Sequence, residues 1–227
     1  SARAIEKTEF EDTYSLDRLG IPLIELVVWH DMHTPEDTRK VAQNVGQLFR
    51  LTGVSRRGLG SIRQDINVSI KDGNRIEIKG CQELDLIPEI VKREVQRQLG
   101  LIEVKKELEK RGISGFRLKE KDVSWIFKGT QSKQVRSALD DNKKVFGLPL
   151  KKMNGILGYE LQQNRRVGTE IASVLKASTT LKGLFHSDEL PNYGVTKEEV
   201  SKLKECLTTS EDDAFILLLC SPEQFKK

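Results

Sequence analysis

Seven polar side chains alternate with apolar ones along two neighbouring runs within residues 60–80. Successive side chains of a β-strand point to opposite faces, so the alternation predicts two strands, each with one polar and one apolar face. The polar positions are Arg63, Asp65, Asn67, Ser69, Arg75, Glu77 and Lys79. Acids, bases and an amide gathered on one sheet face could bind a phosphate group and its metal ion, because phosphate pairs with Arg and Lys and Mg²⁺ takes oxygen ligands.

The two runs, residues 62–70 and 75–79, are expected to pair as an antiparallel hairpin with both polar faces on the same side. Odd-numbered residues must then face odd-numbered residues, which favours a three-residue loop at residues 72–74 over a two-residue turn. Gln64 is the one polar interruption of the apolar face. A solvated face whose opposite charges pair across the strands is the structural alternative. Asp, Asn and Ser form strands poorly, so three of them on one face favour a binding role.

Glu25 is the only charged residue in the apolar run IPLIELVVW at residues 21–29. We expect this run to be a buried strand. An isolated buried carboxylate is too costly to keep, so Glu25 should either pair with a base or bind a metal ion.

The composition restricts the class of protein. A chain of 227 residues can form one large or two ordinary domains. Its net charge of +4, with 32% charged residues, permits a nucleic-acid partner without requiring one. No run reaches the ~20 apolar residues of a membrane span. The three cysteines form no CxxC pair, which predicts reduced thiols in a cytoplasmic protein. Because the sequence begins like the middle of a fold, we expect an excised fragment.

Helix signals surround the two runs of alternating residues. Thr34 followed by Pro35 is typical of a helix start, and this helix is expected to end near Leu51. Apolar residues at three-to-four spacing predict a second helix over residues 88–112, whose many Lys and Arg are expected to form a solvated face. Further along, we expect helices at 132–139, 168–176 and after Thr196, and strands at 145–150, 181–185 and 214–220.

Residues 112–130 lack helical periodicity and are expected to connect two domains. Together, the expected strands and helices predict an α+β fold. An antiparallel sheet with helices occupies residues 1–126, and a compact α/β unit follows over residues 127–227. The run AFILLLC near the end is apolar throughout, which is typical of a central strand.

Four motifs in this order, IPLIE, LTGVS, GSIRQDINVSI and RIEIK, resemble the catalytic region of the B and E subunits of tRNA-dependent amidotransferases. Where the B-type pattern continues as KNLNS, this chain has KGCQEL, which is similar to the archaeal E type. The stretches FKGTQSKQVRSAL and GLFHSDELPNYG look like the insertion that the E type shares with bacterial-type aspartyl-tRNA synthetases. The resemblance covers nearly the whole chain.

The resemblance implies an ATP-dependent carbon–nitrogen ligase, a glutaminyl-tRNA synthase of the glutamine-hydrolysing type. In that family ATP phosphorylates the side-chain carboxylate of glutamate misacylated onto tRNA(Gln), and ammonia then displaces phosphate. The resemblance also implies a catalytic fold similar to that of glutamine synthetase and a requirement for Mg²⁺. It further implies an asparaginase-like partner, the D subunit, that produces the ammonia. Without the rest of its own subunit, the fragment is expected to be inactive.

Roles for the candidate residues follow from the same resemblance. Glu25 matches the metal-ligand position of the PLIE motif. Arg63 and Lys79 are assigned to phosphate charge, and Asp65 and Glu77 to a metal ion or to the groups around it. Ser61 and Asn67 are expected to line the ATP site. For the hairpin residues, an ion pair that only holds the strands together is the structural alternative.

Two other classes of function compete with this interpretation. A pure interaction module would use the hairpin structurally and dock tRNA or a partner protein through its second domain. A piece of an aspartyl-tRNA synthetase would explain the insertion-like stretches, but not the series of motifs from IPLIE to RIEIK.

Overall fold

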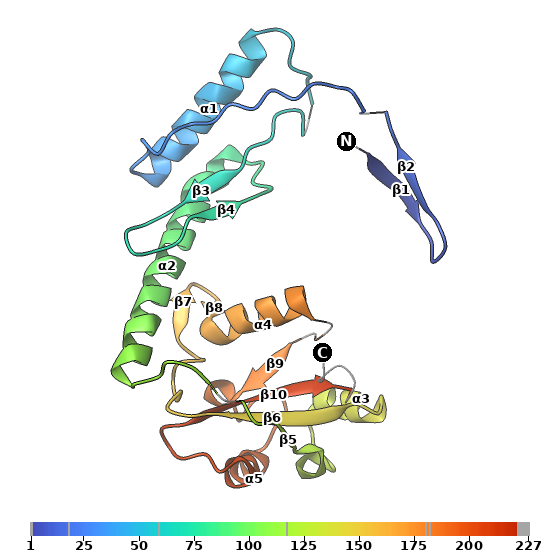
Figure 1. The fold of residues 1–227 in the computed structure, drawn as a ribbon, viewed down its shortest axis with the longest axis vertical. Coiled ribbons are helices and arrows are strands. Elements are labelled where there is room, and N and C mark those ends of the chain that lie inside the picture. The colour runs from blue at the N-terminus through green and yellow to red at the C-terminus, as the bar shows by residue number, and fades with distance from the viewer. Residues whose placement is uncertain are drawn as a thin grey trace.

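The computed structural model describes residues 2–17, 19–58, 60–116, 118–179, 181 and 183–221. Its elements form a mixed α+β arrangement in which every strand pairing is antiparallel (Figure 1). The expected α+β class is therefore confirmed. No described helix is both long and apolar enough to cross a membrane.

The N-terminal part consists of a hairpin, an extended segment and a helix. Strands β1 (Arg3–Lys7) and β2 (Asp12–Ser15) pair with each other and, among the described residues, with no other strand. Helix α1 (Pro35–Leu51) starts where the sequence predicts, because the Thr34 hydroxyl accepts a hydrogen bond from the amide of Asp37 at 3.1 Å. Ala42 of this helix contacts the small core beneath the next hairpin, but α1 has no buried residue.

The second hairpin, β3 (Ile66–Val68) with β4 (Ile76–Ile78), rests on the long helix α2 (Ile87–Lys110). A short 3₁₀ turn, η1 (Leu84–Leu86), leads into that helix. A small core joins the two elements. It contains Ile66, Val68, Cys81 and Ile87, with Ile78, Ile90, Val91 and Val95 beside them.

A four-stranded sheet organises the C-terminal part, in the order β5-β6-β10-β9. Its strands are β5 (Lys121–Asp122), β6 (Lys144–Leu150), β10 (Ala214–Cys220) and β9 (Leu184–His186). Residues of β10 enter two cores alternately: Ile216 and Leu218 lie in one, Phe215 and Leu217 in the other. Burial on both faces explains why this strand is apolar throughout, and its predicted central position is confirmed.

Helices cover both faces of this sheet (Figure 1). The core with Phe215 also contains residues of η2 (Ser124–Phe127), α3 (Lys133–Asp140) and α5 (Lys197–Leu207). The core with Ile216 takes in α4 (Val167–Ser178) and the last turns of α2. A small hairpin, β7 (Glu160–Gln162) with β8 (Arg165–Arg166), precedes α4, and η3 (Ser187–Glu189) follows β9.

The predicted helices all occur, with ends shifted by a few residues. Helix α5 begins after Thr196 as expected, with a capping box in which the Thr196 and Glu199 side chains each accept a hydrogen bond from the other's backbone. The strand expected at 181–185 is observed as Leu184–His186, and no local pattern predicted β5, β7 and β8. The division into domains at residue 126 stays a prediction, although β5, on its N-terminal side, already belongs to the C-terminal sheet.

Candidate functional site

The β3–β4 hairpin presents the polar face that the sequence predicts. Asn67 lies opposite Glu77, so odd-numbered residues face odd-numbered residues as expected. Exposure alternates along both strands: the odd-numbered positions are exposed and the even-numbered ones are buried or half-buried, with Ile66, Val68 and Ile78 packed in the core shared with α2. The exposed set comprises Ser61, Arg63, Asp65, Asn67, Ser69, Arg75, Glu77 and Lys79. Gln64 interrupts the covered face, and its amide nitrogen is satisfied there by donating to the carbonyl of Cys81 at 3.1 Å.

The strands are shorter than expected, and the predicted three-residue loop at 72–74 is wrong. Pairing stops at Val68 and Ile76, so seven residues connect the strands. Within this connection the amide of Gly73 donates to the carbonyl of Ile70 at 3.1 Å, and Asp72 adopts a left-handed conformation with φ 65°. A Cβ at Gly73 would lie 2.3 Å from Oε1 of Gln98, so a larger residue there would have to displace that side chain. The tip of the hairpin is thus fitted to α2, a constraint that the local sequence does not reveal.

An ion triad occupies the centre of the polar face. The Lys79 ammonium lies 3.0 Å from Asp65 Oδ2 and 3.0 Å from Glu77 Oε1. Hydrogen bonds to Asp65 and Glu77 raise the pKa of Lys79 above its ordinary value. All three side chains remain about half exposed, so solvent screens their attraction and the triad contributes little to stability.

The donor set of this face fits a hard cation. Two carboxylates already converge on one positive charge, and carboxylate oxygens are the ligands that Mg²⁺ takes in proteins, with water and substrate phosphate completing its shell. Within the described ranges no group of three or more His, Cys, Asp or Glu side chains could enclose a metal ion. Asp65 and Glu77 could therefore hold a metal ion only together with other ligands.

Glu25 lies in a different environment from the one the sequence predicts. Residues 21–29 form no strand, and every one of them is exposed, so the expected buried strand is wrong here. A strand is buried by neighbouring strands and covering elements, and the described strands of the N-terminal part pair only as two separate hairpins. The role of Glu25 as a metal ligand stays a prediction.

Sequence reasoning missed a cluster of charged residues on α2. The helix was expected to carry its charges on a solvated face, yet Glu94 is only 8% and Gln98 only 3% exposed. Gln98 bonds to the backbone of β3, and Glu94 pairs with Arg97 of α2 itself. Arg97 also pairs with Glu170 of α4, so the cluster joins elements that are far apart in the sequence. The one sign of this cluster in the sequence is the i, i+3 spacing of Glu94 and Arg97, and solvent-exposed ion pairs on helices have the same spacing.

Comparison with known proteins decides the family. The profile of the GatB/GatE catalytic domain matches residues 1–198, which is most of the chain. The chain belongs to the GatB/GatE catalytic domain family. The polar hairpin and the other motifs that carried the resemblance lie within the matched residues, and the resemblance is confirmed.

Relatives of this GatB/GatE chain are named as the E subunit of glutamyl-tRNA(Gln) amidotransferase. The proteins of Thermococcus sibiricus and Pyrococcus furiosus are 51% and 50% identical to it over 229 residues. That of Saccharolobus islandicus is 48% identical over 232 residues. These alignments cover 100% of the chain but only 36–37% of the relatives, so it spans little more than a third of their length.

Proposed function

We propose that this chain is the part of a glutamyl-tRNA(Gln) amidotransferase that activates the misacylated glutamate. Its substrates would be ATP and tRNA(Gln) charged with Glu, and an asparaginase-like D subunit would supply the ammonia. The observation that carries the proposal is the polar face of β3–β4, on which Asp65, Asn67, Glu77 and Lys79 gather. Membership of the GatB/GatE family and the names of the relatives support it.

The chemistry needs positioning and charge neutralisation more than a protein nucleophile. An oxygen of the glutamate side-chain carboxylate attacks the γ-phosphorus of ATP, and the bond to ADP breaks. The acyl phosphate then has a good leaving group. Ammonia attacks its carbonyl carbon, loses a proton, and phosphate departs to leave the amide of Gln-tRNA(Gln).

Each candidate residue has a role in this scheme. Arg63 and Lys79 would offset the negative charge of the transferring phosphoryl group. Asp65, Glu77 and Glu25 would hold Mg²⁺, which neutralises phosphate charge when it is bound. Ser61 and Asn67 would line the nucleotide. For phosphate to engage Lys79, the ammonium must exchange at least one of its two carboxylate partners, which the exposure of the triad permits.

A second candidate function, a docking module for tRNA or for a partner protein, is favoured by one observation. Asp65, Lys79 and Glu77 satisfy one another, as expected of a hairpin whose charges serve only to hold its strands together. The two candidates differ in whether removing one of these charges stops amidation.

Asp65→Asn in the full-length protein, assembled with its ammonia-producing partner, tests the proposal. The change keeps the shape of the side chain and removes a charge, so we expect kcat/KM for ATP-dependent amidation to fall about 100-fold. Hydrolysis of the amide donor by the partner should continue. The matched control is Asp72→Asn on the same hairpin, because Asp72 is exposed at the turn and Asn tolerates its left-handed conformation. Equal amidation by both variants would favour the docking module.

A further inference from the structure

Helix α2 is shared by two cores that lie at its two ends. Its first turns pack under the β3–β4 hairpin through Ile90, Val91 and Val95. Its last turns pack into the core of the four-stranded sheet through Val104 and Leu108. Figure 1 shows the helix running from the β3–β4 hairpin to the four-stranded sheet, which together with its covering helices and the β7–β8 hairpin forms the C-terminal unit. The orientation of the polar hairpin relative to the C-terminal unit therefore depends on how the middle of α2 is held.

A continuous chain of polar contacts crosses the middle of α2. On the hairpin side, the Gln98 amide donates to the carbonyl of Val68 in β3 at 3.3 Å and to Glu94 Oε1 at 2.9 Å. Within the helix, Nε and Nη2 of Arg97 donate to the two oxygens of Glu94, both at 2.8 Å. On the far side, Arg97 Nη1 lies 3.6 Å from Glu170 Oε2 on α4. Glu170 in turn pairs with Arg165 of β8.

The charges of this chain of contacts are largely withdrawn from water. Side-chain exposure is 16% for Arg97 and 20% for Glu170. Burial alone would raise the pKa of Glu94, but hydrogen bonds from Arg97 and Gln98 outweigh it and lower the pKa below the ordinary value. The hydrogen bond to Glu94 likewise raises the pKa of Arg97. Both groups stay ionised, and a buried charge that loses its partner is strongly unfavourable, so the geometry is held firmly.

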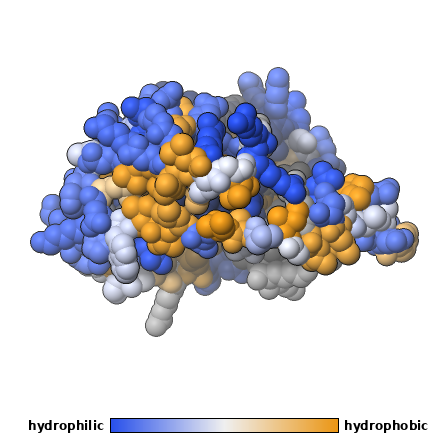
Figure 2. Space-filling view, turned by 90° about the horizontal axis from the view of Figure 1, so that it is seen from above, coloured by the Kyte–Doolittle hydropathy of each residue, from blue (hydrophilic) through white to orange (hydrophobic). Residues whose placement is uncertain are grey.

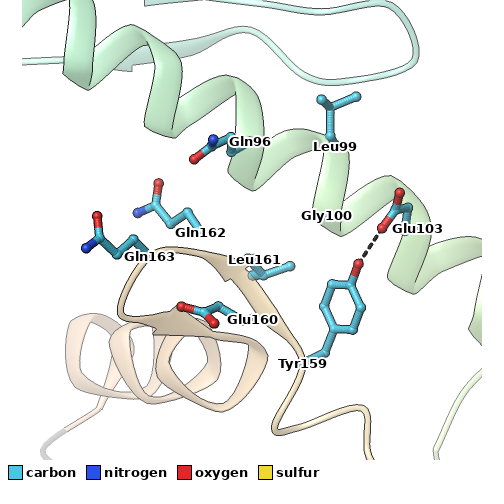
Figure 3. A pocket seen from close by; sticks show the side chains of 9 residues that line it. All are labelled: Gln96, Leu99, Gly100, Glu103, Tyr159, Glu160, Leu161, Gln162 and Gln163. Atoms are coloured by element: carbon cyan, nitrogen blue, oxygen red, sulfur yellow. Dashed lines mark hydrogen bonds between the residues drawn. The ribbon is translucent and has the colours of Figure 1, made fainter.

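Close packing beside these charges prevents α2 from sliding. Gly100 faces Leu161 of β7, and a Cβ at position 100 would lie 3.1 Å from the Cα of Leu161. One turn further on, the Tyr159 hydroxyl donates to Glu103 (Figure 3). Around these contacts lies an open cavity of about 390 Å³ between α2 and the β7–β8 hairpin. The helix thus touches the C-terminal unit by backbone contact and by ion pairs at neighbouring turns.

We propose that Arg97 and Glu170 are positioning residues, which lock the C-terminal unit in one orientation relative to the polar hairpin. The effect of this lock on catalysis rests on the proposed function. The charged end of a tRNA that both units bind reaches the hairpin in register only if the units keep a fixed relative orientation. The ion pair between α2 and α4 adds to the constraint that the contact of Gly100 with Leu161 already provides, and no contact of either residue with the reacting atoms is required.

The test is Glu170→Gln in the full-length protein assembled with its ammonia-producing partner. Glu170 is the more exposed member of the pair, so the variant is expected to fold, and Arg97 keeps its bond to Glu94. Spin labels at Asp72 on the hairpin tip and at Lys176 on α4 report the distance between the units. We expect a broader distance distribution and a KM for Glu-tRNA(Gln) raised about tenfold, with kcat within about twofold of wild type.

The matched control is Glu89→Gln, the same change on the helix α2. Glu89 pairs with Arg93 within α2 at 2.7 Å, and this pair does not connect the two units. Its distance distribution and KM should stay as in wild type. Glu170→Asp keeps the carboxylate and should recover part of the loss, and Arg97→Lys, which loses the planar fork, should change both readouts in the same direction as Glu170→Gln.

Two results would overturn the proposal. One is a Glu170→Gln variant that matches Glu89→Gln in both distance distribution and KM. The other is a loss of kcat and thermal stability with an unchanged distance distribution, which would make the pair merely structural. Failure of the proposed function is distinguishable from both, since the wild-type complex would then show no ATP-dependent amidation, while the distance distributions would still report on the ion pair.

Discussion

Asp213 is an acid that the fold removes almost completely from water and nevertheless keeps charged. Its side chain is 4% exposed and lies between the end of β6 and the start of β10. One carboxylate oxygen accepts from the Lys151 ammonium and from the amide of Ser210, each at 2.8 Å, and the other from the amide of Lys152 at 2.9 Å. Burial alone would raise the pKa of Asp213, but these hydrogen bonds outweigh it and hold the pKa far below its usual range. The carboxylate thereby ties together two neighbouring strands of the sheet.

Asp213→Asn should lower the free energy of unfolding by about 2 to 3 kcal/mol at neutral pH, because an amide cannot accept all these hydrogen bonds and donates where acceptance is needed. The unfolded carboxyl has a pKa of about 3.9, and the folded one lies lower. The stabilisation by this charge is complete above about pH 4 and is lost as pH falls toward the folded pKa, so the difference between wild type and variant should shrink below about pH 4. Urea unfolding across this range measures it. The neighbouring, exposed Asp212→Asn should show no such difference, and a gap that persists undiminished at low pH would contradict the assignment.

At the scale of elements, two glycines in helices differ in how much space surrounds the position of a Cβ. Gly46 in α1 has no atom within 4 Å of the position that a Cβ would take. Gly100 in α2 has the Cα of Leu161 at 3.1 Å and its carbonyl oxygen at 3.3 Å from that position. Backbone cannot move aside as a flexible side chain can, so the glycine in α2 sets how closely the helix approaches β7.

The pair Gly46→Ala and Gly100→Ala should therefore change stability in opposite directions. Alanine gains about 1 kcal/mol over glycine in a helix interior, and at position 46 nothing opposes this gain. At position 100 the steric cost of about 1–3 kcal/mol should outweigh it and destabilise the protein. Thermal unfolding of the two variants in parallel gives the answer. Equal stabilisation by both would mean that α2 and β7 are not held in the observed contact.

Local sequence rules predicted the elements wherever the deciding contacts are local. Period-two alternation correctly placed Asp65 and Glu77 on one exposed face, and the capping box of Thr196 and Glu199 fixed the start of α5. Prediction failed where a distant partner decides. The seven-residue connection of the hairpin approaches Gln98 of α2 closely at Gly73, and the run 21–29 is a strand only if other strands pair with it. The pair of Glu94 and Arg97 likewise extends to α4, because Arg97 also pairs with Glu170, 73 residues further along.

The whole molecule is unevenly packed. The C-terminal sheet has a core on each face, whereas no described residue between positions 2 and 58 is buried. Large apolar side chains in this part are strongly exposed, including Leu23 at 77%, Val27 at 76% and Trp29 at 75%. Seen from the end of the molecule where α1 lies, apolar residues gather on the surface (Figure 2). Exposed apolar side chains that gather in this way are typical of a surface that makes further contacts.

A double substitution, Leu23→Ser with Val27→Ser, should have different effects in the 227-residue chain and in a longer protein of the length that its relatives have. In the 227-residue chain both side chains are exposed, so we expect the thermal midpoint to stay within about 1 °C of wild type, while binding of the dye ANS falls because the apolar surface shrinks. In the full-length protein, if the rest of the chain covers residues 21–29, the same change removes two buried side chains and should destabilise by about 2 to 5 kcal/mol.

Val174→Ser on α4, an exposed apolar position outside this region, is the control and should leave both proteins unchanged. Destabilisation of the 227-residue chain, or unchanged stability of the full-length one, would show that the surface around Leu23 and Val27 is not one that the rest of the protein covers.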